Sequence, residues 1–321
     1  MAKILLTGGS GFLGRYALHT FLKLGAQVLV PTRHPRQLGK LFGRQFRNLE
    51  IVKGIFYDPT LIERYKEFQP DFIVHLAAIR GEGNGKWRDY YEVNVKGTEI
   101  LVQFALEHPP QKFLYCSTVG VFGTIPARLP ADPWTPAEPD SLYHKSKYLA
   151  ENYVVNELRN AIPLAIVRPT ITYGAGDTGF IARMATLVQK RLFPLVRGSV
   201  KIHLLDVHTF ARALPIILNA SAKEIFINLA DKHPVYLREV VDVMYRYFHG
   251  KHYPHWRRVP KLFYTLGKSA TRLTHMNALT ISLRLISESW YYDTSHMEQL
   301  KIPQINTLEG IGNYLKKVFP K

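Results

Sequence analysis

The sequence has only one cysteine in 321 residues, Cys116. A single cysteine excludes an intrachain disulfide and is typical of a protein from a reducing compartment. The sequence also lacks a signal segment ahead of its first glycines, and it lacks any apolar run near the roughly 18 residues that a membrane-spanning helix needs. These absences predict a cytoplasmic protein.

Acidic residues are scarce, and they are unevenly placed. The chain has 42 Lys and Arg against 25 Asp and Glu, a formal net charge of +17, with no acid before Glu50 and none between residues 243 and 287. Such an excess favours anionic partners, which include phosphorylated cofactors, acidic substrates, anionic membranes and nucleic acid. A generally basic, solvated surface is the alternative interpretation.

The sequence has no Pro/Gly/Ser-rich linker and no fixed repeat, but it does contain a regular alternation of apolar strands with amphipathic helices. Strands are expected at residues 3–7, 27–30, 72–76, 112–117 and 164–168, with helices at 94–107 and 143–158 among them. This order predicts an α/β fold, a Rossmann doubly wound parallel sheet with a smaller, mostly helical C-terminal substrate lobe. We expect residues 1–168 to form the dinucleotide-binding domain, a strand at 225–228 to return to the sheet, and 169–321 to form mainly the lobe.

A glycine triplet follows the first predicted strand. Gly8, Gly11 and Gly14 are spaced three residues apart, with Phe12 and Leu13 between the last two as further expected cofactor contacts, and the segment leads directly into a helical pattern. Glycine permits a tight turn and lets backbone N–H groups approach a pyrophosphate at the helix N-terminus. The segment predicts a dinucleotide-binding loop.

The end of the second predicted strand selects the cofactor. NAD sites usually carry an acid there, which binds the ribose 2′-hydroxyl. This chain has Arg33, followed by Arg36, and no acid before Glu50. Because a guanidinium binds a 2′-phosphate in bidentate fashion, Arg33 indicates NADP(H) rather than NAD(H).

Tyr143 and Lys147 lie four residues apart in a predicted helix, which places them on one face. A tyrosine with a pKa near 10 is a poor base at neutral pH. A neighbouring ammonium stabilises the phenolate and lowers that pKa. The pair therefore predicts general acid–base catalysis by Tyr143.

Several segments resemble, in order, motifs of the extended short-chain dehydrogenase/reductase family, which forms the NAD-dependent epimerase/dehydratase superfamily. Besides the glycine loop and the Tyr-x-x-x-Lys pair, they are residues 75–78 (His-Leu-Ala-Ala), 94–98 (Asn-Val-Lys-Gly-Thr), 116–123 (Cys-Ser-Thr-Val-Gly-Val-Phe-Gly) and 168–174 (Arg-Pro-Thr-Ile-Thr-Tyr-Gly). The resemblance implies an NAD(P)-dependent oxidoreductase.

The resemblance also implies a role for each matching residue. Tyr143 exchanges a proton with the substrate oxygen, Thr118 hydrogen-bonds that oxygen, and Lys147 also holds the nicotinamide ribose. Asp58 is assigned to the adenine region. The other expected cofactor contacts are Leu76, Ala77, Ala78, Asn94, Ser117 and Pro169.

The substrate is less determined. Residues 168–173 resemble the 3β-hydroxysteroid dehydrogenase and dihydroflavonol reductase branch, which implies a secondary alcohol or ketone of a sterol-, flavonoid- or lipid-like substrate. A nucleotide-sugar epimerase or dehydratase using bound NAD is one alternative. A non-catalytic NADP(H)-sensing regulator is another, and the intact Thr118, Tyr143 and Lys147 set argues against it and against a nucleic-acid partner.

Two partner predictions remain. Residues 259–273 combine an apolar helix face with Lys and Arg, so they either lie on an anionic membrane surface or pack on the domain and cover the pocket. A homodimer is expected only by analogy with the family.

Overall fold

The structure is a computed structural model that describes residues 1–43, 45–80, 85–265 and 277–320. Its centre is a seven-stranded parallel sheet in the order β10-β6-β5-β4-β1-β2-β3. The strands are β1 (Lys3–Thr7), β2 (Gln27–Thr32), β3 (Leu49–Lys53), β4 (Phe72–His75), β5 (Lys112–Cys116), β6 (Leu164–Pro169) and β10 (Glu224–Leu229).

This topology confirms the predicted doubly wound Rossmann sheet. The strand order reverses between β1 and β4, so the carboxyl ends of these two strands flank the crevice where such sheets bind ligands. The strand expected at residues 225–228 lies within β10, which pairs in parallel with β6.

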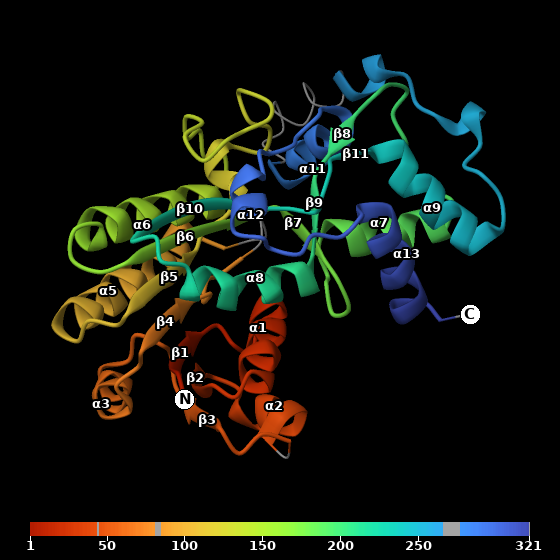
Figure 1. Ribbon diagram of the computed structural model, residues 1–321. Helices are drawn as coiled ribbons and strands as arrows, with labels where there is room; N and C mark the ends of the chain where they lie inside the picture. Colours follow the sequence, from red (N-terminus) through yellow and green to blue (C-terminus); the bar gives the residue numbers. More distant parts are fainter. Residues whose placement is uncertain (44, 81–84, 266–276, 321) are drawn as a thin grey trace.

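Helices cover both faces of the sheet (Figure 1). One face carries α1 (Phe12–Lys23), α2 (Pro35–Leu38), α8 (Val207–Asn219) and α12 (Ser295–Gln299), and the other carries α3 (Pro59–Phe68), α5 (Gly97–Glu107) and α6 (Leu142–Leu158). Side chains alternate along each strand, so Leu6 and Val28 pack on the first face while Leu5 and Leu29 pack on the second.

A second lobe has its own apolar core, in which Tyr173, Tyr245 and Trp290 are buried. It is mostly helical and contains α7 (Phe180–Gln189), α9 (Leu237–His249), α11 (Asn277–Ser287), α13 (Thr307–Val318) and the short strands β7 (Ile171–Tyr173), β8 (Lys201–Ile202), β9 (Leu204–Asp206) and β11 (Val235–Tyr236). α8 and β10 belong to the sheet layers although they lie within 169–321, so the chain passes between the lobes more than once.

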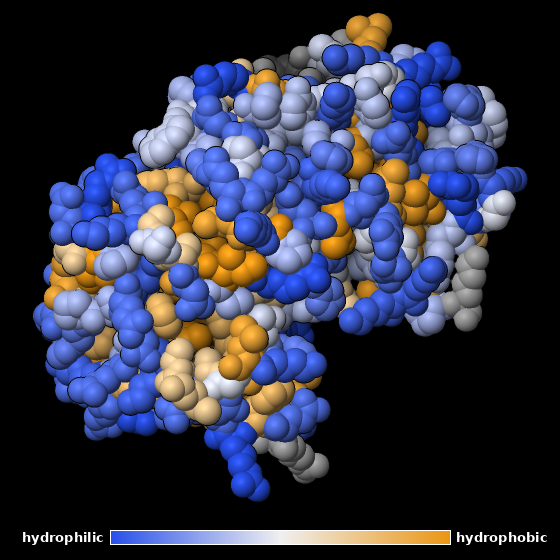
Figure 2. Space-filling view, viewed as in Figure 1, coloured by the Kyte–Doolittle hydropathy of each residue, from blue (hydrophilic) through white to orange (hydrophobic). Residues whose placement is uncertain are grey.

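The outer surface is mixed in character. Figure 2 shows apolar side chains gathered over β10 and α12 and again beside α9, between stretches of hydrophilic surface. None of the helices in the described ranges combines the length and the apolar character that crossing a bilayer requires. Residues 266–273 of the predicted amphipathic segment lie outside the described residues.

A buried ion pair fixes α6 against the sheet. Arg168 on β6 donates from Nε to Glu151 Oε2 at 3.0 Å and also from Nη2 to Glu151 Oε1, and both side chains are almost fully buried. Arg168 Nη1 donates to the carbonyl of Pro133 at 2.8 Å. Because Glu151 lies one helical turn beyond Lys147, this pair also sets where Lys147 sits.

We predict that Glu151→Gln lowers the free energy of unfolding by about 3–5 kcal/mol, because it leaves the Arg168 charge buried without its partner. The matched control is Glu224→Gln, which breaks the far more exposed Arg159–Glu224 pair and should cost no more than about 1 kcal/mol. Urea unfolding of both variants measures the difference. Equal losses of unfolding free energy in the two variants would show that the buried pair stabilises the fold no more than the exposed one.

Candidate active site

The glycine loop has the geometry that the sequence predicts. Gly8 has a φ of +73°, and a side chain there would meet the backbone of Ala77 at 2.6 Å. A Cβ on Gly14 would lie 2.0 Å from the Gly8 carbonyl oxygen. Glycine is therefore required at both positions, which lets α1 pack directly against the turn.

The first turn of α1 is free of competing groups. Its N-cap, Gly11, provides no side-chain hydrogen bond, and the turn contains no acid. Phe12 and Leu13 are half-buried there. The backbone N–H groups of this turn can therefore receive an anion such as a pyrophosphate.

At the end of β2, Thr32 is buried and its hydroxyl donates to Ser10 Oγ of the glycine loop at 3.2 Å. Arg33 and Arg36 are both exposed. Burial raises the pKa of Tyr57, and the positive charge of Arg33 acts to lower it. Arg33 therefore lies near Tyr57, which precedes α3. The basic position expected for a 2′-phosphate is thus open to solvent beside the glycine loop.

Asp58 has a structural use. Its carboxylate accepts hydrogen bonds from Thr60 N at 2.9 Å and Thr60 Oγ1 at 2.8 Å, and it thereby caps α3. These bonds hold the pKa of Asp58 below its ordinary value. The contact with adenine stays a prediction.

His75, at the end of β4, supports the loop that contains Leu76, Ala77 and Ala78. His75 is completely buried between Thr7 Oγ1 (2.6 Å) and Thr98 Oγ1 (2.9 Å). Burial lowers the pKa of His75 well below its usual value, so the ring is neutral.

Asn94 ties the same loop to α6. Its Oδ1 accepts from Ile79 N at 2.7 Å, and its Nδ2 donates to Ile79 O at 3.0 Å and to Ser146 Oγ at 2.9 Å. The side chain is fully buried and its amide groups are already paired. Asn94 thereby positions the loop against α6, and its direct contact with the cofactor stays a prediction. It lies in a π-helical turn, Tyr91–Lys96, rather than in the regular helix expected at residues 94–107.

Thr118, Tyr143 and Lys147 come together at the carboxyl ends of β5 and β6. Thr118 caps the 3₁₀ turn Val119–Phe122 by accepting from Gly120 N at 3.1 Å. This turn packs on the first turn of α6, because a Cβ on Gly120 would lie 2.2 Å from His144. Tyr143 is in that first turn, and Lys147 follows one turn later.

Lys147 is a buried cation. Its side chain is about 1% exposed, and its Nζ lies 4.0 Å from the centre of the Tyr115 ring. Burial lowers the pKa of Lys147 to about 8, while Cys116 and Glu151 act to raise it. The ammonium is thus charged at neutral pH and close to losing its proton.

Tyr143 behaves differently from the sequence expectation. The surrounding protein keeps water from its phenol and raises its pKa, and the cation that opposes this effect is Arg80 rather than Lys147. Arg80, which follows the β4 loop, also lies 3.8 Å from Asp177. No motif singled out Arg80, because its neighbours in space are distant in sequence.

Three buried polar atoms lack a hydrogen-bond partner among the described residues: Ser117 Oγ, Thr170 Oγ1 and Asp177 Oδ2. Ser117 follows β5, Thr170 follows Pro169 at the end of β6, and Asp177 follows β7. Buried polar groups require partners, so these atoms suit a polar ligand. Together with the glycine loop they are compatible with a nicotinamide dinucleotide, and the residues that contact it stay a prediction.

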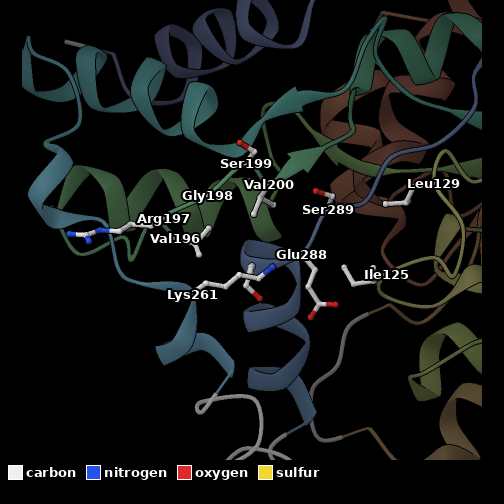
Figure 3. A pocket seen from close by; sticks show the side chains of 11 residues that line it. Ile125, Leu129, Val196, Arg197, Gly198, Ser199, Val200, Lys261, Glu288 and Ser289 are labelled. Atoms are coloured by element: carbon white, nitrogen blue, oxygen red, sulfur yellow. The ribbon is translucent and has the colours of Figure 1, made fainter.

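A cavity lies elsewhere, in the C-terminal lobe (Figure 3). Its volume is about 300 Å³, and it opens between the chain after α7 and the end of α11. It is lined by Ile125, Leu129, Val196, Arg197, Gly198, Ser199, Val200, Lys261, Ser287, Glu288 and Ser289. None of these residues was predicted from the sequence as a site residue.

Known proteins resemble this chain in sequence and in fold. UDP-glucose 4-epimerase 4 of Oryza sativa subsp. japonica is 25% identical over 206 residues, which cover 60% of this chain and 56% of that protein. GDP-6-deoxy-D-talose 4-dehydrogenase of Aggregatibacter actinomycetemcomitans is 31% identical over 177 residues, 54% of each chain. The matches thus span little more than half the length of these relatives.

The Bordetella bronchiseptica enzyme WbmH, solved in complex with NAD⁺, has the same fold over 99% of both chains, with a TM-score of 0.77 and 20% identity. The two relatives named above are nucleotide-sugar enzymes rather than members of the 3β-hydroxysteroid dehydrogenase branch that residues 168–173 suggest. The model of the NAD dependent epimerase/dehydratase family matches residues 4–230. The chain belongs to the NAD-dependent epimerase/dehydratase family.

Proposed function

We propose that this protein transfers a hydride to and from a sugar carbon of a nucleoside-diphosphate sugar, with Tyr143 as the proton-transfer group. The observation that carries the proposal is the placement of Tyr143 and Lys147 one helical turn apart on α6, with Lys147 buried against the Tyr115 ring of β5. The names of the two relatives support the substrate class, since both refer to nucleoside-diphosphate sugars.

The chain's own residues account for the proton. A bound nicotinamide dinucleotide supplies the hydride acceptor and donor. As the sugar alcohol is oxidised, the deprotonated phenolate form of Tyr143 accepts its hydroxyl proton, and Thr118 donates a hydrogen bond to the same oxygen. In the reverse step Tyr143 returns that proton. Arg80 is the cation that lowers the pKa of the phenol and so favours the phenolate, and Lys147 contributes a buried positive charge one helical turn away.

A second candidate is a dissociable NADP(H)-linked reductase of an apolar alcohol or ketone. Exposed Arg33 favours it, because no acid lies at the end of β2 to bind a ribose 2′-hydroxyl. A homodimer stays a prediction by analogy.

We predict that Arg33→Ala separates the two candidates. If NADP(H) is the cofactor, loss of the guanidinium weakens NADPH binding by about tenfold or more, since charge-assisted hydrogen bonds contribute about 1.5–3 kcal/mol, and NADH binding stays unchanged. Fluorescence titration measures both affinities. Lys23→Ala, which removes a charge at the far end of α1, is the control.

Protein that arrives with tightly bound NAD, or that prefers NADH irrespective of Arg33, would favour the epimerase and reject the NADP(H) reductase.

We predict that Tyr143→Phe lowers kcat by about 10²–10⁴-fold, because the proton loses its carrier while the ring stays in place. Tyr153→Phe is the control on the same helix, since Tyr153 Oη only accepts an exposed hydrogen bond from Gln103. Turnover of UDP-glucose and UDP-glucuronic acid, followed by separation of the sugars, gives the rates. A Tyr143→Phe protein with full activity would overturn the mechanism and favour a non-catalytic sensor.

We also predict that Lys147→Met abolishes turnover yet stabilises the fold by roughly 1–3 kcal/mol at pH 7, because it removes a buried charge and keeps the volume. The pKa of Lys147 falls from 10.5 to about 8 on folding, so below pH 8 the folded state bears the full cost of the charge. As the pH rises toward 10.5 the wild type loses this cost, and the advantage of the variant should shrink. Denaturation at pH 7 and 9.5 measures it, and an advantage that grows with pH would contradict the prediction.

A further inference from the structure

Part of the C-terminal lobe exposes large apolar side chains among cations. Leu192, Trp256, Leu262 and Phe263 have exposed fractions of 66%, 76%, 66% and 62%. They belong to residues 190–197 and 251–263, which we call the basic ridge. Figure 1 shows the light-blue chain after α9 running along the outer edge of this lobe.

The two segments of the basic ridge form one surface. Arg257 Nη1 donates to the carbonyl of Arg191 at 2.9 Å, and its guanidinium lies 5.0 Å from the Trp256 ring centre. Val259 N donates to Leu195 O, and Arg197 N donates to Val259 O, each at 2.8 Å. These hydrogen bonds hold the two segments side by side.

The charge of the basic ridge has one sign. Its Lys and Arg residues number seven, and it contains no Asp or Glu; the cations are Lys190, Arg191, Arg197, Lys251, Arg257, Arg258 and Lys261. Among the described residues, Asp242 on α9 lies beside the basic ridge. Its carboxylate lies 2.8 Å from the exposed His252 and 3.2 Å from Arg246. Glu288 lines the same cavity as Arg197 and Lys261 (Figure 3). The surface therefore keeps a large positive excess.

We propose that the basic ridge docks on an anionic lipid bilayer, with Trp256, Leu262 and Phe263 entering the headgroup region. Exposed tryptophan and phenylalanine are costly in water and favourable at a membrane interface, and adjacent cations are attracted to acidic headgroups. The 62–66% exposure of Leu262 and Phe263 shows that these two side chains do not pack on the domain. The proposal is independent of the reaction at Tyr143.

The test is co-sedimentation of the full chain with vesicles of phosphatidylcholine alone and with vesicles that contain phosphatidylglycerol. We expect binding only to the anionic vesicles, and weaker binding in about 1 M salt, where the Debye length falls to about 3 Å. Trp256→Ser should weaken the partition at least about tenfold, as should Leu262→Ser combined with Phe263→Ser.

Trp134 provides the matched control, because its exposed fraction of 66% is similar and it lies against Phe226 of β10, away from the basic ridge. Trp134→Ser should bind vesicles as the wild type does. Lipids brominated in the acyl chains should quench the tryptophan fluorescence of the wild type. This quenching should be lost in Trp256→Phe and kept in Trp134→Phe.

Three results would overturn the proposal. The first is no binding to anionic vesicles. The second is binding that Trp256→Ser and the double variant leave unchanged, which would be simple adsorption of a protein with a net charge of +17. The third is self-association without lipid that the same substitutions abolish, which would make the basic ridge an interface between two copies.

Discussion

The buried pair between Glu151 and Arg168 is the interaction on which the candidate site depends. It joins the middle of α6 to the end of β6, and it does so within the apolar surroundings of Phe122 and Phe226, whose rings lie 5.0 and 5.7 Å from the guanidinium. A pair in such surroundings has one low-energy geometry, because either charge left alone would be strongly unfavourable. The position of α6 along the sheet is fixed as a result.

The position of α6 along the sheet also sets the position of Lys147. The Glu151 carboxylate one turn away raises the pKa of Lys147 and so partly offsets the cost of burying the ammonium. The start of α6 is held separately, because Ser146 Oγ accepts a hydrogen bond from Asn94 Nδ2 and His144 packs against Gly120. These contacts fix the part of α6 that carries Tyr143 and Lys147.

The second lobe is joined to the sheet by another buried acid. Asp231, just after β10, accepts hydrogen bonds from Tyr173 Oη at 2.9 Å, Thr307 Oγ1 at 2.8 Å and Asp206 N at 2.8 Å. Burial raises the pKa of Asp231 to about 7. One carboxyl group thereby connects β7, β9 and α13.

The sequence was most informative where the chemistry is local. The glycine spacing and the four-residue step from Tyr143 to Lys147 are set by single elements, so their geometry could be predicted. The pairing of Asn94 with Ile79 and Ser146, or of Arg168 with Glu151, joins separate elements and could not. Burial likewise decides that the pKa of Tyr143 is raised, and a motif carries no information on it. Residues 168–173 favoured one substrate branch, whereas the two named relatives are nucleotide-sugar enzymes, so a short motif does not decide the substrate.

The α6 helix holds a charged Lys147 in a buried site beside Glu151. NMR titration of the Lys147 side chain, assigned by comparison with Lys147→Met, is the measurement to make. We expect a pKa of about 8 in the wild type and a lower value in Glu151→Gln, because the neighbouring negative charge is lost. An ordinary pKa near 10.5 that Glu151→Gln leaves unchanged would show that Lys147 is neither desolvated nor coupled to Glu151.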